Sequence, residues 1–93
     1  SSQSWYVYLL RCEDGSYYTG ITNNLYRRMT QHENGEGSTY VASRGFNQLC
    51  YAITQPSKGA ALSTEHEVKQ RRSSEKPGFF IDHAHLAYEP LSE

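Results

Sequence analysis

The chain has 93 residues, enough for one small folded domain, and its 37% hydrophobic and 20% charged residues are typical of globular proteins. Its apolar runs are far shorter than the ~18 residues of a membrane-spanning helix, and no segment resembles a signal peptide. We therefore expect no membrane partner. Cys12 and Cys50 form no C-x-x-C pair and are too few for a disulfide framework, so we read them as buried thiols and expect a cytoplasmic protein. We expect one domain over residues 1–93, with its core in about 5–72 and a C-terminal tail in about 73–93.

The charge is unevenly distributed, although the net charge is only −1. All nine Lys and Arg residues lie within residues 11–76, where seven acidic residues leave a net charge of +2. Residues 77–93 contain no basic residue and include three acidic ones. A local basic face that contacts nucleic acid is therefore compatible with the small total charge.

A β-hairpin is predicted at the start of the chain. Apolar and aromatic side chains occupy both faces of residues 5–10, as in a strand that is buried on both sides. Asp14-Gly15 is typical of a hairpin turn, and "YYTGIT" follows as the second strand. A two-residue turn would place Tyr8 and Tyr18 on opposite faces of the hairpin. A three-residue turn, or a bulge at Gly15, would place them on one face.

A helix is predicted next, in "TNNLYRRMTQHENG", capped by one of its first three residues and ended by Gly35. Leu25 and Met29 are spaced as the buried stripe of this helix, and Arg28 and His32 have the same spacing on its border. The Gly- and Ser-rich segment that follows, up to residue 46, predicts a loop, and "NQLCYAIT" predicts a third strand.

A second helix is predicted over about 58–72, opened by Pro56-Ser57. Glu65 lies within its apolar stripe, where a carboxylate is costly unless it has a partner. Either a buried salt bridge, for example with Arg28, or a functional role would explain this position. Beyond residue 77 the pattern predicts a short helix that packs Phe79, Phe80 and Leu86 on the core.

Five residues are candidates for one catalytic site: Tyr8, Tyr18, Arg28, His32 and Glu65. Taken singly, each has a structural explanation, as a packed tyrosine, a solvated arginine, a histidine at a helix C-terminus or an ion-paired acid. Taken together, they suit phosphodiester hydrolysis, which needs an activated water, positive charge for the phosphate and help for the leaving oxygen. Arginine matches phosphate oxygens, and one carboxylate can hold one Mg²⁺ that keeps most of its waters.

The ordered motifs resemble the signature of the GIY-YIG nucleases. They are "YVY" at 6–8, "YTG" at 18–20, Arg28, His32, and Glu65 within "AALSTEHEVKQ", which is similar to the small stand-alone bacterial members, the YhbQ-like subfamily. The match spans about residues 5–72. The resemblance implies an α+β fold, with a three-stranded antiparallel sheet flanked by helices. It also implies cleavage of DNA with one divalent metal ion.

The resemblance also implies roles for the site residues. Tyr8 would be the general base for the attacking water, and Tyr18 would orient the phosphate or the water. His32 would hydrogen-bond the tyrosine or assist proton transfer, and the choice of base among these three stays open. Arg28 would bind the scissile phosphate, and Glu65 would ligate Mg²⁺ or Mn²⁺.

The resemblance further implies that Gly20 lets backbone approach the site closely. The chain departs from the family motifs at Tyr6, where the family name has Gly, and at Thr19, which replaces Ile. Some longer relatives use an Asn after the glutamate, and this chain has none after Glu65. One contact to phosphate or water is therefore unassigned.

Further residues are candidates for nucleic-acid binding, by contact with backbone phosphates or, for the tyrosine, by stacking on a base. These residues are Arg11, Arg27, Tyr40, Arg44, Lys69 and Arg72. The partner would be DNA, with RNA as an open alternative, and the oligomeric state is not predicted.

The main hypothesis is a metal-dependent endonuclease of low sequence specificity that selects nucleic-acid structure instead. The alternative is a non-catalytic module that binds nucleic acid or protein with the same fold. A third reading is a phosphatase or nucleotide hydrolase that acts on small substrates, which a deep closed pocket would favour.

Overall fold

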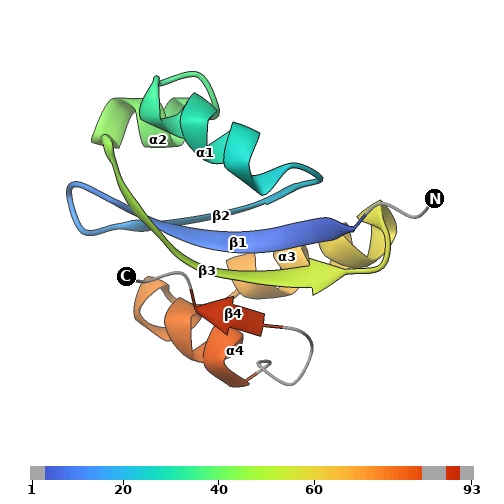
Figure 1. Cartoon of the computed structure of the whole chain (residues 1–93). Coiled ribbons are helices and arrows are strands. Elements are labelled where there is room, and N and C mark those ends of the chain that lie inside the picture. Colours follow the sequence, from blue (N-terminus) through green and yellow to red (C-terminus); the bar gives the residue numbers. More distant parts are fainter. Residues whose placement is uncertain (1–3, 83–87, 91–93) are drawn as a thin grey trace.

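The computed structural model describes residues 4–82 and 88–90 of the chain. In this part, four antiparallel strands form one sheet in the order β2-β1-β3-β4 (Figure 1). The predicted three-stranded antiparallel sheet is therefore confirmed, and a short fourth strand extends it beyond β3. The strands are β1 (Trp5–Cys12), β2 (Tyr17–Thr22), β3 (Phe46–Gln55) and β4 (Tyr88–Pro90).

Helices cover both faces of the sheet, as Figure 1 shows, with α1 and α2 on one face and α3 and α4 on the other. None of the helices in the described part of the chain is long and apolar enough to cross a membrane. They are α1 (Leu25–Glu33), α2 (Thr39–Arg44), α3 (Lys58–Lys69), the 3-10 helix η1 (Ser73–Glu75) and α4 (Lys76–Asp82).

Helix α2 lies where the sequence predicted a loop, and that prediction was wrong. Ser38 caps the helix by accepting hydrogen bonds from the backbone N–H groups of Tyr40 and Val41. Gly45 ends it with φ +87°, a conformation that glycine adopts without steric cost. The glycine and serine that indicated a loop are therefore the end signals of a six-residue helix.

Helix α3 begins as predicted, because Ser57 caps it through the N–H of Ala60. It ends at Lys69, three residues before the predicted boundary. The N–H of Gln70 bonds back to Glu67 and Val68, and Arg72 then turns to an extended conformation that starts η1.

The β1–β2 turn has three residues, and this sets the register of the hairpin. The N–H of Cys12 donates to the carbonyl of Ser16, and Gly15 adopts φ +87°. Tyr8 therefore pairs with Gly20, and Leu10 pairs with Tyr18. Of the two arrangements considered from the sequence, the structure has the one that places both tyrosines on one face.

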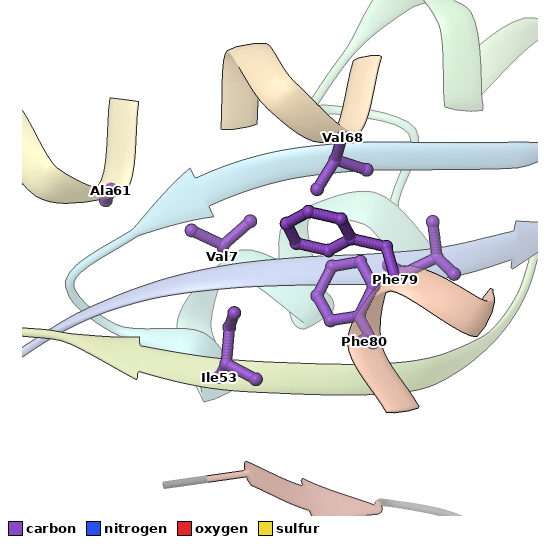
Figure 2. Close-up of a cluster of buried hydrophobic side chains, with 7 residues drawn as sticks. Val7, Ile53, Ala61, Val68, Phe79 and Phe80 are labelled. Atoms are coloured by element: carbon purple, nitrogen blue, oxygen red, sulfur yellow. The ribbon is translucent and has the colours of Figure 1, made fainter. Parts of the chain in front are cut away.

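The sheet separates two apolar clusters, so β1 is buried on both sides as predicted. One cluster lies under α3 and α4 and contains Val7 and Leu9, with Phe79 and Phe80 from α4 (Figure 2). The other lies under α1 and α2 and contains Tyr8 and Leu10. The predicted packing of both phenylalanines is confirmed, whereas Leu86 lies outside the described residues.

Helix α1 differs from the prediction in what it buries. It is capped by Asn24, one of the three candidates, through the N–H of Arg27. Leu25 and Met29 are only half-buried, whereas His32 is 2% exposed. His32, and not Leu25 or Met29, is therefore the most deeply buried side chain of this helix.

Candidate active site

Tyr8 lies on the face of the sheet that α1 and α2 cover, with its side chain 1% exposed. It stands opposite Gly20 in the β1–β2 pair, and a Cβ atom at position 20 would lie 2.6 Å from Tyr8 Oη. Gly20 therefore makes room for a side chain, the ring of Tyr8, and not for backbone as expected. Thr19 Oγ1 also donates a hydrogen bond to the Tyr8 carbonyl oxygen at 2.5 Å.

His32 on α1 reaches the Tyr8 hydroxyl, with Nε2 2.9 Å from Tyr8 Oη. Burial, together with the nearby charge of Arg28, lowers the pKa of His32 to about 4. The imidazole is therefore neutral near pH 7. A favourable interaction between a charged His32 and the end of α1, the structural explanation considered from the sequence, does not account for its position.

Three rings meet at this point. The centroid of His32 lies 5.8 Å from that of Tyr8 and 5.7 Å from that of Tyr18, both in edge-to-face contact. The two tyrosine rings are 6.4 Å apart. Such edge-to-face contacts between aromatic rings are favourable, so packing holds the three side chains together.

Arg28 is half-buried on α1 and acts on the same hydroxyl. Its charge, and a hydrogen bond to the Tyr8 side chain, lower the pKa of Tyr8. It therefore differs from a solvated surface arginine, which was the structural explanation considered for it.

Glu65 on α3 has a side chain that is 17% exposed, with Oε2 3.3 Å from Lys69 Nζ. The ion pair that the sequence suggested with Arg28 is thus made with Lys69, one turn further along α3. Glu65 also acts electrostatically on Tyr8, although the two residues belong to opposite sides of the sheet.

The surroundings of Tyr8 have opposing effects on its ionisation. Burial raises the pKa of Tyr8 well above its ordinary value of 10.0, and charges on Tyr18 and Glu65 add to this rise. The charge of Arg28 opposes it. Because burial is the largest contribution, Tyr8 holds its proton near pH 7 in the chain by itself.

A model of the GIY-YIG catalytic domain matches residues 4–77, most of the chain and all of the residues just described. The chain belongs to the GIY-YIG family. This confirms the resemblance seen in the motifs, and it indicates a nuclease.

Small GIY-YIG proteins of the YhbQ-like subfamily are the relatives that resemble the chain over most of its length. A UPF0213 protein of Nitratidesulfovibrio vulgaris is 40% identical over 82% of this chain and 69% of its own. One from Cupriavidus pinatubonensis is 42% identical over 83% and 86%. The solution NMR structure of a UPF0213 protein from Bacillus halodurans superposes with TM-score 0.51 at 40% identity, covering 82% of this chain and 81% of that one.

GIY-YIG nucleases generally use divalent metal ions, and Glu65 is the side chain at this site whose chemistry fits one. Within residues 4–82 and 88–90, no three His, Cys, Asp or Glu side chains gather as a metal-binding group. A single, partly desolvated carboxylate nevertheless suits Mg²⁺, which keeps several of its waters in proteins. Lys69 would compete with such an ion for Glu65.

The proposed nucleic-acid contacts of this GIY-YIG domain lie in different environments. Arg11, Arg27 and Arg72 are exposed. Arg44 donates a hydrogen bond to Asp14 at 2.8 Å, and its guanidinium lies 4.3 Å from the ring centroid of Tyr40.

Tyr40 also packs on Tyr18, with centroids 5.6 Å apart. Lys69 holds Glu65, as described above. Three of the six proposed contacts therefore already have partners within the protein.

Two residues at the site were not anticipated. The ring of Phe46 stacks on His32 with centroids 6.4 Å apart and planes at 7°. The backbone of Gly37 lies against the imidazole. Nothing in the sequence distinguishes Phe46 from an ordinary strand residue, whereas Gly37 is the second glycine of "GEG" and lies beyond the turn that Gly35 makes.

Proposed function

We propose that this protein is an endonuclease that hydrolyses phosphodiester bonds of DNA with one divalent ion, Mg²⁺ or Mn²⁺. The observation that carries the proposal is the convergence on the Tyr8 hydroxyl. His32 is hydrogen-bonded to it, Tyr18 packs beside it, and the charges of Arg28 and Glu65 act on it from different helices. A buried hydroxyl influenced by an arginine and a carboxylate is typical of a catalytic site.

Tyr8 is the general base in this proposal, because both neighbouring donors stabilise its ionised form. His32 is neutral, and its Nδ1 is buried with no hydrogen-bond partner among the described residues. A proton on Nδ1 would be a buried donor without an acceptor, which is costlier than a bare lone pair. When Tyr8 is ionised its Oη can only accept, so the proton of neutral His32 is then on Nε2 and is donated to Tyr8 Oη.

Arg28 binds the scissile phosphate and offsets the negative charge that develops on it. Its charge already acts on Tyr8, which supports a role for Arg28 beside both the base and the bound phosphate. Tyr18, half-buried between Tyr8 and Tyr40, orients the phosphate or the attacking water.

Glu65 holds the divalent ion in this proposal. When bound, the ion supplies positive charge that favours ionised Tyr8 and assists the leaving oxygen. In the chain by itself, Glu65 raises the pKa of Tyr8. Neutralisation of the Glu65 charge would therefore favour the ionised form of Tyr8.

The proposed substrate preference is for structure over sequence. We expect flaps, nicks, branched or single-stranded DNA to be cut in preference to a defined sequence. RNA stays an open alternative and is tested beside DNA.

The test is cleavage of labelled DNA and RNA substrates with Mg²⁺ or Mn²⁺, by wild type, Glu65→Ala, Tyr8→Phe and Tyr26→Phe. Tyr26 is 85% exposed on α1 and serves as the matched control for loss of a tyrosine hydroxyl. We expect cleavage by wild type and Tyr26→Phe only. Binding without cleavage by wild type would favour the non-catalytic module.

A further inference from the structure

The imidazole of His32 is held by one hydrogen bond only among the described residues. Nε2 bonds Tyr8, whereas Nδ1 is buried and has no partner. A functional histidine commonly has its ring fixed by a second hydrogen bond on the other nitrogen. Some other contact must therefore prevent this ring from turning.

Gly37 supplies that contact. A Cβ atom at position 37 would lie 2.6 Å from His32 Nδ1, 2.8 Å from Cε1 and 3.0 Å from Cγ. The backbone at Gly37 is thus closed against the ring edge that carries Nδ1, while Nε2 points to Tyr8. Phe46 stacks on the ring face.

Position 37 requires glycine because a side chain would not fit there, and not because of its backbone conformation. Gly35, two residues earlier, has φ +78°, which disfavours other residues, yet the nearest atom to its built Cβ is Ala42 Cβ at 3.9 Å. Gly37 is not among the glycines with positive φ. Its missing side chain matters because the imidazole occupies that space.

We propose that Gly37 is a positioning residue for catalysis, which acts by packing against His32 so that Nε2 stays directed at Tyr8 Oη. The inference rests on the proposed function, since it assigns Tyr8 as the base. It adds a residue in the α1–α2 connection that touches neither substrate nor metal. It also explains how a buried imidazole keeps one orientation without a second hydrogen bond.

The first experiment compares Gly37→Ala with Gly35→Ala. We expect Gly37→Ala to lower kcat by at least about tenfold with little change in KM, because displacing a catalytic group by ~1 Å can cost about 100-fold in rate. Gly35→Ala strains the backbone of the same connection without meeting the ring, so its kcat should stay near wild type. Equal losses of kcat in the two variants would overturn the proposal.

A double-mutant cycle then tests whether Gly37 acts through His32. In a His32→Ala background the methyl group at position 37 has no ring to displace. Gly37→Ala should therefore cause no further loss of kcat there. A loss as large as in the wild-type background would show that Gly37 acts by another route.

A measurement without substrate keeps this proposal separate from the proposed function. Long-range ¹H–¹⁵N NMR of the histidine side chains reports which imidazole nitrogen is protonated. We expect one and the same His32 tautomer in wild type and Gly35→Ala, and a changed or averaged signal for His32 in Gly37→Ala. An unchanged His32 spectrum would overturn the inference, even if the wild type cleaves nothing.

Discussion

Asp14, in the turn between β1 and β2, accepts a hydrogen bond of 2.8 Å from Arg44 at the end of α2. The Arg44 guanidinium lies over the ring of Tyr40, and Tyr40 packs on Tyr18. The hairpin turn is thus connected through α2 to a tyrosine of the candidate site. Arg44 therefore has a structural position in addition to its proposed contact with nucleic acid.

Arg44→Ala is therefore expected to lower the thermal stability of the protein, whereas Arg27→Ala is not. Arg27 is exposed, so its loss should reduce the slope of log Kobs against log[salt] for DNA binding by about 1 and leave Tm unchanged. Loss of Arg44 should also lower Tm, by about 2–4 °C. Salt titrations of binding and thermal melts of both variants check this, and an unaltered Tm in Arg44→Ala would contradict it.

Gly20→Ala should impair catalysis more than folding. The added Cβ would lie 2.6 Å from Tyr8 Oη, so the ring must move away from His32. We expect single-turnover cleavage to slow by about 100-fold. Gly59→Ala is the control, because its Cβ would meet only Ser57 Oγ at 3.9 Å. A cleavage rate close to wild type for Gly20→Ala would argue against Tyr8 as the base.

Lys69→Met should strengthen metal binding. Lys69 pairs with Glu65 at 3.3 Å, and an ion at Glu65 must displace it. Because exposed pairs of this spacing contribute only ~0.3–0.5 kcal/mol, the Mg²⁺ concentration for half-maximal cleavage should fall by about twofold. Lys58→Met, which removes a lysine near the Trp5 ring, is the control. The same Mg²⁺ dependence in both variants would count against Glu65 as the ligand.

The stability of the protein should decrease on mild acidification because of His32. The pKa of His32 is lowered to about 4 in the folded state. Between pH 6.5 and 4 the unfolded chain therefore binds more protons than the folded chain, and the free energy of unfolding decreases as the pH is lowered. From pH 7 to 5 the contribution of His32 to the free energy of unfolding should decrease by about 2 kcal/mol. Urea unfolding at both pH values measures it. His32→Gln should show a correspondingly smaller decrease, and an equal decrease would refute the assignment.

Phe80→Ala should destabilise the domain strongly, although Phe80 lies in the predicted tail. Its side chain is 0% exposed in the same cluster as Val7 and Ile53 (Figure 2). Removal of a buried phenylalanine typically costs about 3–5 kcal/mol of unfolding free energy. Its neighbour Ile81 is 53% exposed, so Ile81→Ala should cost much less. Denaturant unfolding of both variants compares them, and similar losses would place Phe80 outside the core.

The sequence predicted the sheet, because the alternation in residues 5–10 and the hairpin signal are local features. It left the shared face of Tyr8 and Tyr18 open, since that depends on one residue of turn length. Helix α2 was missed because its glycine and serine end signals are also loop signals.

The burial of His32 could not be predicted from the sequence either. The helical spacing placed it at the border of a stripe formed by Leu25 and Met29. Its burial depends on a hydrogen bond to a residue 24 positions away and on a ring from β3. Such long-range contacts leave no pattern within the helix itself.

Strand β1 contributes to two separate environments through alternate residues. Val7 and Leu9 belong to the cluster under α3 and α4, and Tyr8 belongs to the site under α1. Insertion or deletion of one residue within the strand would move the side chains of the shifted part from one face to the other. Apolar residues on one face can therefore be substituted while the hydroxyl on the other face stays in place, whereas a change of one residue in strand length disturbs both environments.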